Sequence, residues 1–456
     1  MLDDNGQEKE RLLAQLAAGV PVFWINHAVA QSHDGDAYRQ DIADARQRLR
    51  DARYHLQGSF PETRGLADVV ESPLLAAEDL AKRWNIPRWL VKADHSLPIA
   101  GSIKARGGFN EVLAFAERVA AENGLGRTSP ERPNYTHPDA RSVFLRYSVV
   151  VGSTGNLGLS VGMIASSLGF RTMVHMSRDA KTWKRNLLRA NGVEVIEHAG
   201  DYSIAVQQGR QAAEADPKCH FVDDEHSIDL FAGYGAAAAE LASQLEERRI
   251  VVDNDHPLFV YVPCGVGGAP GGITYGLKSL FGKNVHCFWA EPSASPCMLL
   301  QLLMGVHRSV SVYDIGLDNV TEADGLAVGS ASPFVAPLMA DQVSGIYTAN
   351  DGHMLDIMLS VRDAQGLRVE PSAAIAFLGP LILTASVEGR RYVQAQGLGR
   401  TLPDATHVSW TTGGSLVPAA EWQLLYERAE VFRGKVSALA DAWKAVTRRR
   451  WVDFSN

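Results

Sequence analysis

A lysine set among small residues is the first feature of this sequence that can do covalent chemistry. Lys104 lies in the segment Ala100-Gly-Ser-Ile-Lys-Ala-Arg-Gly-Gly108, where small side chains let the backbone approach a ligand closely. A lysine that attacks a carbonyl must lose its proton near neutral pH. We expect desolvation and the positive charge of Arg106 to lower the pKa of Lys104. The pattern alone also fits an ordinary surface lysine, because most lysines are solvated.

A glycine-rich segment after an apolar run offers a second candidate site. In Gly152-Ser-Thr-Gly-Asn-Leu-Gly158, free N–H groups at the start of a helix can bind a carboxylate. The amide of Asn156 can hydrogen-bond a ring hydroxyl or an oxyanion. The alternative is that Asn156 only caps the helix.

Another glycine-rich segment, Cys264-Gly-Val-Gly-Gly-Ala-Pro-Gly-Gly272, carries five glycines within eight positions. This density predicts a nest of backbone N–H groups for a phosphate monoester, and the alternative is a tight turn. The segment lacks the Gly-Lys-Ser/Thr ending of a Walker A loop and the spacing of a dinucleotide motif. A third segment, Trp410-Thr-Thr-Gly-Gly-Ser415, offers hydroxyls to a polar ligand atom, although a plain turn fits equally well.

Apolar runs and helical patterns alternate from about residue 148, which predicts parallel βαβ units and an α/β fold. In such a sheet, ligands bind beyond the carboxyl ends of the strands, where all three glycine segments fall. The expected strands are 149–151, 172–175, 193–196, 221–222, 259–262 and 286–289, and the expected helices are 156–168, 181–190, 228–246 and 420–448.

The composition excludes several classes of function. The chain has 456 residues, a formal net charge of −8 and no long basic run, so neither nucleic acid nor an anionic membrane is an expected partner. Its four cysteines form no C-x-x-C pair, which argues against a zinc knuckle or a disulfide framework. No signal peptide and no apolar run of about 18 residues is present, so we expect a cytoplasmic protein.

A reactive lysine, a carboxylate loop with Asn156, a phosphate nest and a late Thr-Gly-Gly together suit pyridoxal 5′-phosphate. The order of these elements resembles the fold type II (tryptophan-synthase-β-like) enzymes and, more closely, the D-serine dehydratase (D-serine ammonia-lyase) family. The resemblance extends from about residue 70 to about 420. It rests on residues 97–108, 152–158, 263–272, 291–292, 296–300, 324–329 and 370–373.

The resemblance implies two open, twisted, mostly parallel sheets flanked by helices, with the cofactor in an interdomain cleft. The large cofactor-binding domain would comprise residues 1–114 and 236–456, and the small domain residues 115–235. The state of assembly stays open, with a monomer plausible.

The resemblance also implies a role for each site residue. Lys104 would bond to the cofactor aldehyde, Asn156 would meet the ring hydroxyl, and Thr412 would face the pyridine nitrogen. A neutral hydroxyl at that position leaves the nitrogen largely unprotonated, which suits β-elimination. The phosphate would lie on Gly265, Val266, Gly267 and Gly268, and the substrate carboxylate on Ser153 and Thr154.

Related dehydratases bind a monovalent cation near the phosphate loop. Glu291 and Cys297 are the candidate ligands here, for example for K⁺, and an ordinary salt bridge of Glu291 is the alternative. The chain departs from the family pattern at Ala100, where serine is expected, at the reversed order His95-Ser96, and at Ala269, where another glycine is expected. These departures bear on substrate fit more than on cofactor binding.

The activity implied is dehydration and deamination of a small amino acid, D-serine and also D-threonine, to a keto acid and ammonia. An L-serine/L-threonine dehydratase or a β-replacement synthase of the same fold remains the nearest alternative, because residue types do not decide which face of Cα is deprotonated. A non-catalytic protein that binds a phosphate ligand is the alternative from another class.

Overall fold

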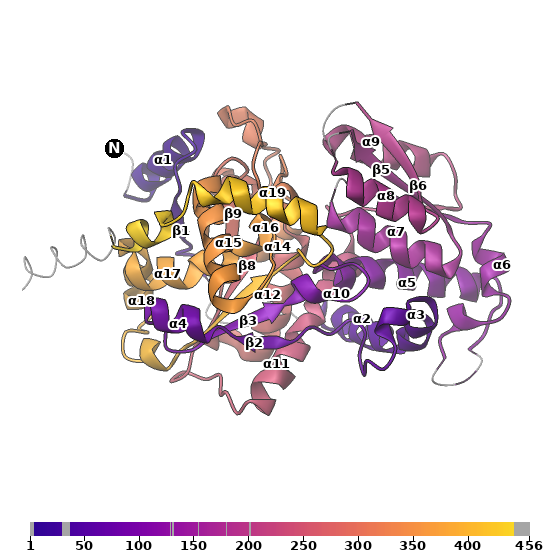
Figure 1. Ribbon diagram of the computed structural model, residues 1–456, viewed down its shortest axis with the longest axis horizontal. Helices are drawn as coiled ribbons and strands as arrows, with labels where there is room; N and C mark the ends of the chain where they lie inside the picture. Colours follow the sequence, from indigo (N-terminus) through magenta and orange to yellow (C-terminus); the bar gives the residue numbers. More distant parts are fainter. Residues whose placement is uncertain are drawn as a thin grey trace, which may run out of the picture. The chain divides into compact units, whose positions relative to one another are not determined.

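The structure is a computed structural model, and it describes residues 4–29, 37–127, 129, 132–153, 155–178, 180–199 and 202–441 (Figure 1). Contacts between residues divide the chain into two compact units. Unit 1 comprises Met1–Gly35, Pro73–His95 and Ala238–Asn456, and unit 2 comprises Asp36–Ser72 and Ser96–Ala237.

Unit 1 is built on a seven-stranded sheet with the order β1-β10-β9-β8-β11-β3-β2. The five central strands are parallel, and β1 and β2 close the two edges in antiparallel pairing. The strands are β1 (Phe23–Ile25), β2 (Leu74–Ala76), β3 (Trp89–Ala93), β8 (Leu258–Pro263), β9 (Val285–Pro292), β10 (Gly345–Ala349) and β11 (Thr406–Thr411).

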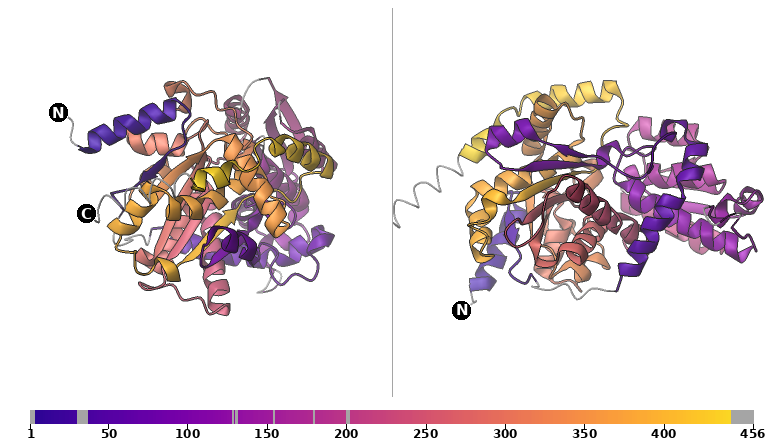
Figure 2. Two further views of the ribbon diagram at one scale, coloured as in Figure 1. Left: turned by 60° about the vertical axis from the view of Figure 1, so that its left-hand side comes forward. Right: turned by 90° about the horizontal axis from the view of Figure 1, so that it is seen from below.

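Helices lie on both faces of this sheet, as Figure 2 shows. Because successive strand residues point to opposite faces, Phe259 and Tyr261 join a core cluster with α15, whereas Trp289 donates a hydrogen bond to Thr274 of α12. The helices of unit 1 are α1 (Asp4–Ala17), α4 (Glu78–Trp84), α11 (Ala237–Glu247), α12 (Gly268–Phe281), α13 (Cys297–Met304), α14 (Val335–Met339), α15 (Asp351–Gln365), α16 (Pro371–Ala374), α17 (Leu378–Ala385), α18 (Val387–Ala395) and α19 (Ala419–Glu430).

Unit 2 holds a four-stranded, wholly parallel sheet with the order β6-β5-β4-β7. Its strands are β4 (Ser148–Gly152), β5 (Arg171–Ser177), β6 (Glu194–His198) and β7 (Cys219–Val222). Its helices are α2 (Arg39–Asp51), α3 (Arg53–Ser59), α5 (Lys104–Glu122), α6 (Ala140–Phe144), α7 (Asn156–Leu168), α8 (Thr182–Ala190), α9 (Tyr202–Glu214) and α10 (Ile228–Gly235).

Two helix predictions are wrong in their extent. The helix expected over 228–246 is divided by a turn at Ala236 into α10 and α11, next to Gly233 and Gly235, which favour helix weakly. The helix expected over 420–448 is interrupted by a turn over 431–434, between α19 and a further helical stretch over 435–441; its expected end lies outside the described residues.

The division into units differs from the expected domain boundaries. Residues 36–72 and 96–114 belong to unit 2, not to the unit that carries the larger sheet. The reason is packing, because α2 and α10 both lie against α5, whose first residue is Lys104. In the described part of the chain, no single helix is both long and apolar enough to cross a membrane, and only one bent pair, Pro371–Ala385 with Val387–Ala395, meets those criteria jointly.

Candidate active site

Lys104 is the first residue of α5, and an acidic side chain holds its amine in place. Its Nζ lies 3.3 Å from Oδ2 of Asp224, which follows strand β7. Nζ also lies 5.5 Å from the centre of the Tyr234 ring, on α10. The Lys104 side chain keeps 21% of its surface exposed.

Glycines allow this close arrangement of α5 and α10. A Cβ on Gly107 would lie 2.5 Å from Cζ of Tyr234, and a Cβ on Gly233 would lie 2.5 Å from the carbonyl oxygen of Arg106. Distances this short are not tolerated between real atoms, so only glycine lets Tyr234 pack beside Lys104. On the other side, Ser160 of α7 donates a hydrogen bond of 2.7 Å to the Lys104 carbonyl.

The expected lowering of the Lys104 pKa is wrong for the chain alone. Burial opposes the ammonium form, but the Asp224 carboxylate and Tyr234 outweigh burial and raise the pKa of Lys104 above its ordinary value. Arg106 does not act as expected, because its guanidinium is buried and donates to the Val70 carbonyl at 3.2 Å and to Ser72 Oγ at 3.3 Å.

Several buried polar atoms around Lys104 lack a hydrogen-bond partner within the described residues. They are Oδ1 of Asp224, the hydroxyl of Tyr234 and Oγ of Ser102. An unpaired buried polar group costs roughly 1–3 kcal/mol, so such atoms are uncommon unless a ligand or water completes them. Their concentration around one lysine indicates a binding site.

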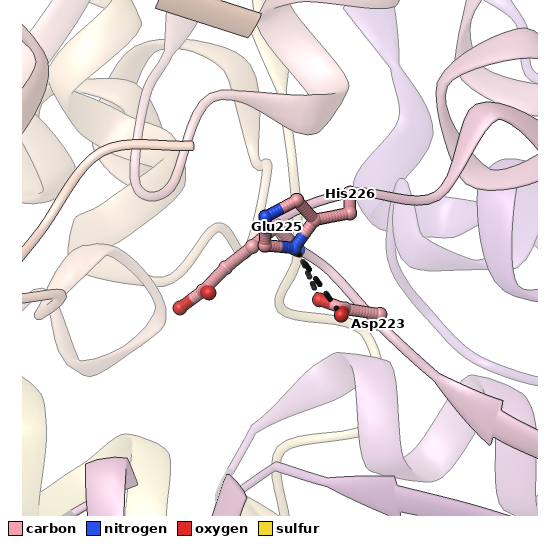
Figure 3. A group of neighbouring side chains, drawn as sticks. All are labelled: Asp223, Glu225 and His226. Atoms are coloured by element: carbon pink, nitrogen blue, oxygen red, sulfur yellow. Dashed lines mark hydrogen bonds and ion pairs between the residues drawn. The ribbon is translucent and has the colours of Figure 1, made fainter. Parts of the chain in front are cut away.

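Asp224 is flanked by a small ion-pair network, which Figure 3 shows. His226 Nδ1 lies 3.2 Å from Oδ2 of Asp223, while Glu225 points away from that pair. Arg210 pairs with Asp223 at 3.1 Å and with Glu225 at 3.6 Å. Asp223, Glu225 and His226 are close enough to share a metal ion, but both carboxylates are already paired with Arg210. We interpret the network as support for the loop that presents Asp224.

Ser153 and Asn156 lie at the carboxyl end of β4, beside the end of β7 that leads to Asp224. The N–H of Ser153 donates to the His175 carbonyl at 2.9 Å, and its Oγ accepts from the N–H of Gly155 at 3.2 Å. Gly155, not Asn156, is the cap of α7, so the capping alternative for Asn156 is wrong. Thr154 lies outside the described residues.

In unit 1, the expected phosphate loop joins β8 to α12. Gly265 and Val266 follow the strand, Gly267 caps the helix, and Gly268 is its first residue. Gly267 has φ +115°, and a Cβ there would lie 2.5 Å from Cε of Met298. The loop therefore needs glycine, and the N-terminus of the 14-residue helix α12 presents backbone N–H groups that favour an anion.

Thr412 follows β11, the neighbour of β8, so it lies at the same edge of the sheet as the phosphate loop. Its surface is 8% exposed. The preceding residue, Thr411, is held by His95 Nδ1 at 2.7 Å and donates to the Lys92 carbonyl at 2.9 Å. His95, one of the departures from the family pattern, thus fixes the turn that carries Thr412.

Glu291 lies on β9, on the other side of β8, and is wholly buried. Its Oε1 accepts from the N–H of Met298 at 2.8 Å and its Oε2 from that of Leu299 at 2.9 Å. Burial raises the pKa of Glu291 to about 8, although both hydrogen bonds favour the charged form. Cys297 donates its thiol to the Gly265 carbonyl at 3.4 Å. Within the described residues, Glu291 therefore caps α13 and does not make the salt bridge given as its alternative.

Known proteins match the chain along most of its length. Residues 67–394 match the family described as pyridoxal-phosphate dependent enzyme. A protein of Burkholderia thailandensis named probable D-serine dehydratase is 53% identical over 422 residues, which cover 92% of this chain and 94% of that protein. A protein of the same name from Burkholderia lata is 51% identical, with 93% and 96% covered. The chain belongs to the pyridoxal-phosphate dependent enzyme family and, within it, to the D-serine dehydratases.

A solved structure is similar at the level of the fold. Diaminopropionate ammonia lyase from Escherichia coli, in complex with D-serine, has a TM-score of 0.70 and 18% identity, over 90% of this chain and 98% of that chain. The predicted α/β class, with helices flanking mostly parallel sheets as in fold type II enzymes, is confirmed.

The residues present fit pyridoxal 5′-phosphate. The glycine loop turns through a positive φ at Gly267 and presents backbone N–H groups at a helix N-terminus that favours a phosphate. Around Lys104, the unpaired Asp224 Oδ1 and Ser102 Oγ are ready to complete their hydrogen bonds with a polar ligand.

Our sequence analysis missed Asp224 and Tyr234. A signal for Asp224 was present, since it belongs to Asp223-Asp224-Glu225-His226 directly after an expected strand, where parallel sheets bind ligands. Tyr234 gave none, because a tyrosine in an alanine-rich helix is an ordinary core residue.

Proposed function

We propose that this protein catalyses the β-elimination of D-serine to pyruvate and ammonia. D-serine is the proposed substrate because the chain is 53% identical to a protein named probable D-serine dehydratase. The partly exposed side chain of Lys104, beside polar atoms that lack a partner within the described residues, supports the β-elimination chemistry.

Bound pyridoxal phosphate supplies an electron sink for the negative charge that forms at Cα of the substrate. Lys104 Nζ holds the cofactor and, once free, takes the Cα proton. Ser153 Oγ and the N–H groups that open α7 bind the substrate carboxylate, and Thr154 has the same predicted role.

The other proposed contacts orient the cofactor. Backbone N–H groups of Gly265, Val266, Gly267 and Gly268 bind the phosphate, with the charge of the α12 N-terminus in support. Asn156, the first residue of α7, meets the ring hydroxyl. The hydroxyl of Thr412 meets the ring nitrogen and leaves it unprotonated.

Glu291 and Cys297 are our candidates for a monovalent cation site, with K⁺ as the expected ion. The raised pKa of Glu291 shows that burial disfavours its charge, which a cation would offset. The Gly265 carbonyl, which accepts the Cys297 thiol, is an oxygen ligand of the type that K⁺ prefers, at the end of the phosphate loop. Activity on D-threonine, a cytoplasmic location and a monomeric state stay predictions.

Pyruvate release from D-serine and from L-serine, measured in parallel on cofactor-loaded protein, tests the proposal. We expect turnover of D-serine alone, and none by Lys104→Ala prepared in the same way. Turnover of L-serine alone would contradict the stereochemistry and favour an L-serine dehydratase of the same fold. A lack of any visible absorbance band with pyridoxal phosphate would favour the non-catalytic alternative.

A further inference from the structure

We propose that Asp224 and Tyr234 form a seat for the free amine of Lys104, which holds Nζ in a fixed place whenever it is not bonded to the cofactor. This inference rests on the proposed function, because a lysine that exchanges with the substrate amine is free during each turnover. Tyr234 acts as a positioning residue in this account, through Lys104.

The seat is formed by two residues, Asp224 in the loop after β7 and Tyr234 on α10. Asp224 Oδ2 lies 3.3 Å from Nζ and supplies the opposite charge. The ring of Tyr234, 5.5 Å from Nζ to its centre, supplies a cation–π contact from α10. The ammonium group thus contacts a carboxylate and an aromatic face at the same time.

The glycines at the seat indicate that the position of Tyr234 is specific. Gly107 lies where a Cβ would meet both Tyr234 Cζ at 2.5 Å and the Leu230 carbonyl oxygen at 2.9 Å. Gly233 lies where a Cβ would meet the Arg106 carbonyl at 2.5 Å. The ring of Tyr234 is wholly buried, and its hydroxyl has no hydrogen-bond partner of good geometry within the described residues. A residue with only a packing role would not need a buried hydroxyl.

Other charged groups near the seat are engaged elsewhere. Glu111 of α5 accepts hydrogen bonds from His220 at 2.8 Å and from Ser227. Arg106 is turned toward Val70 and Ser72.

Behind Asp224, the carboxylates of Asp223 and Glu225 are paired with Arg210, and Asp223 also with His226. Asp224 is therefore the carboxylate that acts directly on Nζ.

The seat predicts that loss of the Asp224 carboxylate makes the Lys104 amine more reactive, although loss of an active-site residue usually lowers reactivity. Asp224 stabilises the ammonium form of Lys104, so removing that charge increases the fraction of neutral, reactive amine. We expect Asp224→Asn to make Lys104 more reactive toward electrophiles at pH 8 while it slows turnover. A residue with only a structural role would lower both.

The test is the rate at which acetic anhydride labels Lys104 in the cofactor-free full chain, followed by mass spectrometry from pH 7 to pH 11. An opposite charge within about 4–6 Å changes a pKa by 1–3 units, so Asp224→Asn should accelerate labelling at pH 8 by about tenfold or more. Tyr234→Leu removes the aromatic ring and should accelerate labelling less, by about two- to threefold, whereas Tyr234→Phe keeps the ring and should leave the rate nearly unchanged. Glu122→Gln is the control for charge, because it removes a carboxylate from the exposed far end of α5 and should also leave the rate nearly unchanged.

Unchanged labelling in both Asp224→Asn and Tyr234→Leu would overturn the seat, and so would an equal acceleration in Glu122→Gln. If Asp224→Asn does not fold, the comparison of Tyr234→Leu with Tyr234→Phe decides, and equal rates in these two variants overturn the role of Tyr234. The labelling needs no cofactor, so it remains informative if the proposed function fails, a failure that the missing absorbance band would reveal by itself.

Discussion

Two buried or half-buried lysines of this protein each form an ion pair with a carboxylate, yet only one of them lies in a candidate active site. Lys92 is the fourth residue of β3, has no exposed surface and pairs with Glu240 of α11. Lys104 opens α5, keeps 21% of its surface exposed and pairs with Asp224 at 3.3 Å. An ion pair is therefore a poor guide to reactivity.

What distinguishes Lys104 is the surroundings of the pair. Glycine at position 107 makes room for Tyr234, and Asp224 keeps one buried oxygen unpaired. These features cost stability and offer a ligand both access and polar partners. We interpret the ion pair of Lys92 as a stabilising contact within unit 1. We interpret the ion pair of Lys104 as a contact that holds the amine in the position where it binds the cofactor.

The largest expected effect is on activity and comes from Lys104. Lys104→Ala should lower turnover of D-serine by about a thousandfold or more, because it removes both the covalent link and the base. The thermal unfolding temperature should change little, as judged by calorimetry of the cofactor-free protein. Substantial turnover by this variant would remove the main distinction between the two lysines.

The second effect is on stability and comes from Lys92. Glu240→Gln removes the carboxylate that is paired with the buried Lys92 ammonium, and breaking a buried ion pair typically costs about 3–5 kcal/mol of unfolding free energy. Calorimetry or urea unfolding should show this loss, and the double change Lys92→Met with Glu240→Leu should recover most of it. A Glu240→Gln variant as stable as the wild type would show that the Lys92 pair is not structural.

A substitution at Gly107 tests whether the space beside Lys104 distinguishes its ion pair from that of Lys92. Gly107→Ala should displace Tyr234 and cost about 1–3 kcal/mol through overpacking, and it should slow the appearance of the visible band with pyridoxal phosphate. Gly58→Ala is the control, because a Cβ there meets nothing within 4 Å. Equal behaviour of the two variants would mean that space at Gly107 is unimportant.

The smallest expected effect concerns Glu291, a buried carboxyl group that accepts two backbone N–H groups. If a monovalent cation binds there, KCl should raise the unfolding temperature of the wild type by a few degrees more than choline chloride at equal ionic strength. Glu291→Gln should lose this difference. The same response to both salts in the wild type would contradict the cation site.

The sequence predicted those parts of the fold that depend on local pattern. The helix expected over 156–168 begins and ends where α7 does, because glycines bound it on both sides and an apolar strand precedes it. Strands β3, β10 and β11 escaped prediction. Apolar runs such as 89–93 are short and lie outside the regular alternation that marks βαβ units. Their place in the sheet is set by tertiary pairing, which one sequence does not display.

The site was predictable to the extent that its residues lie in motifs. The glycine loop lies between β8 and α12 as expected. Glu291 lies near the end of β9 and Thr412 directly follows β11, and these two strands are the neighbours of β8 in the sheet. The protonation of Lys104 was not predictable, because it depends on Asp224, 120 residues away in the chain. Arg106, only two residues away, was the obvious partner and is turned elsewhere. The cofactor cleft and the individual contacts stay predictions.

The measurement that tests the central claim most directly is to reduce the cofactor-loaded protein with borohydride and map the modified peptide by mass spectrometry. Borohydride fixes the bond between a lysine and pyridoxal phosphate, so the label reports which amine is used. We predict a pyridoxyl group on Lys104 and none on Lys92. A label on another lysine, or no label in a protein that turns over D-serine, would contradict the account.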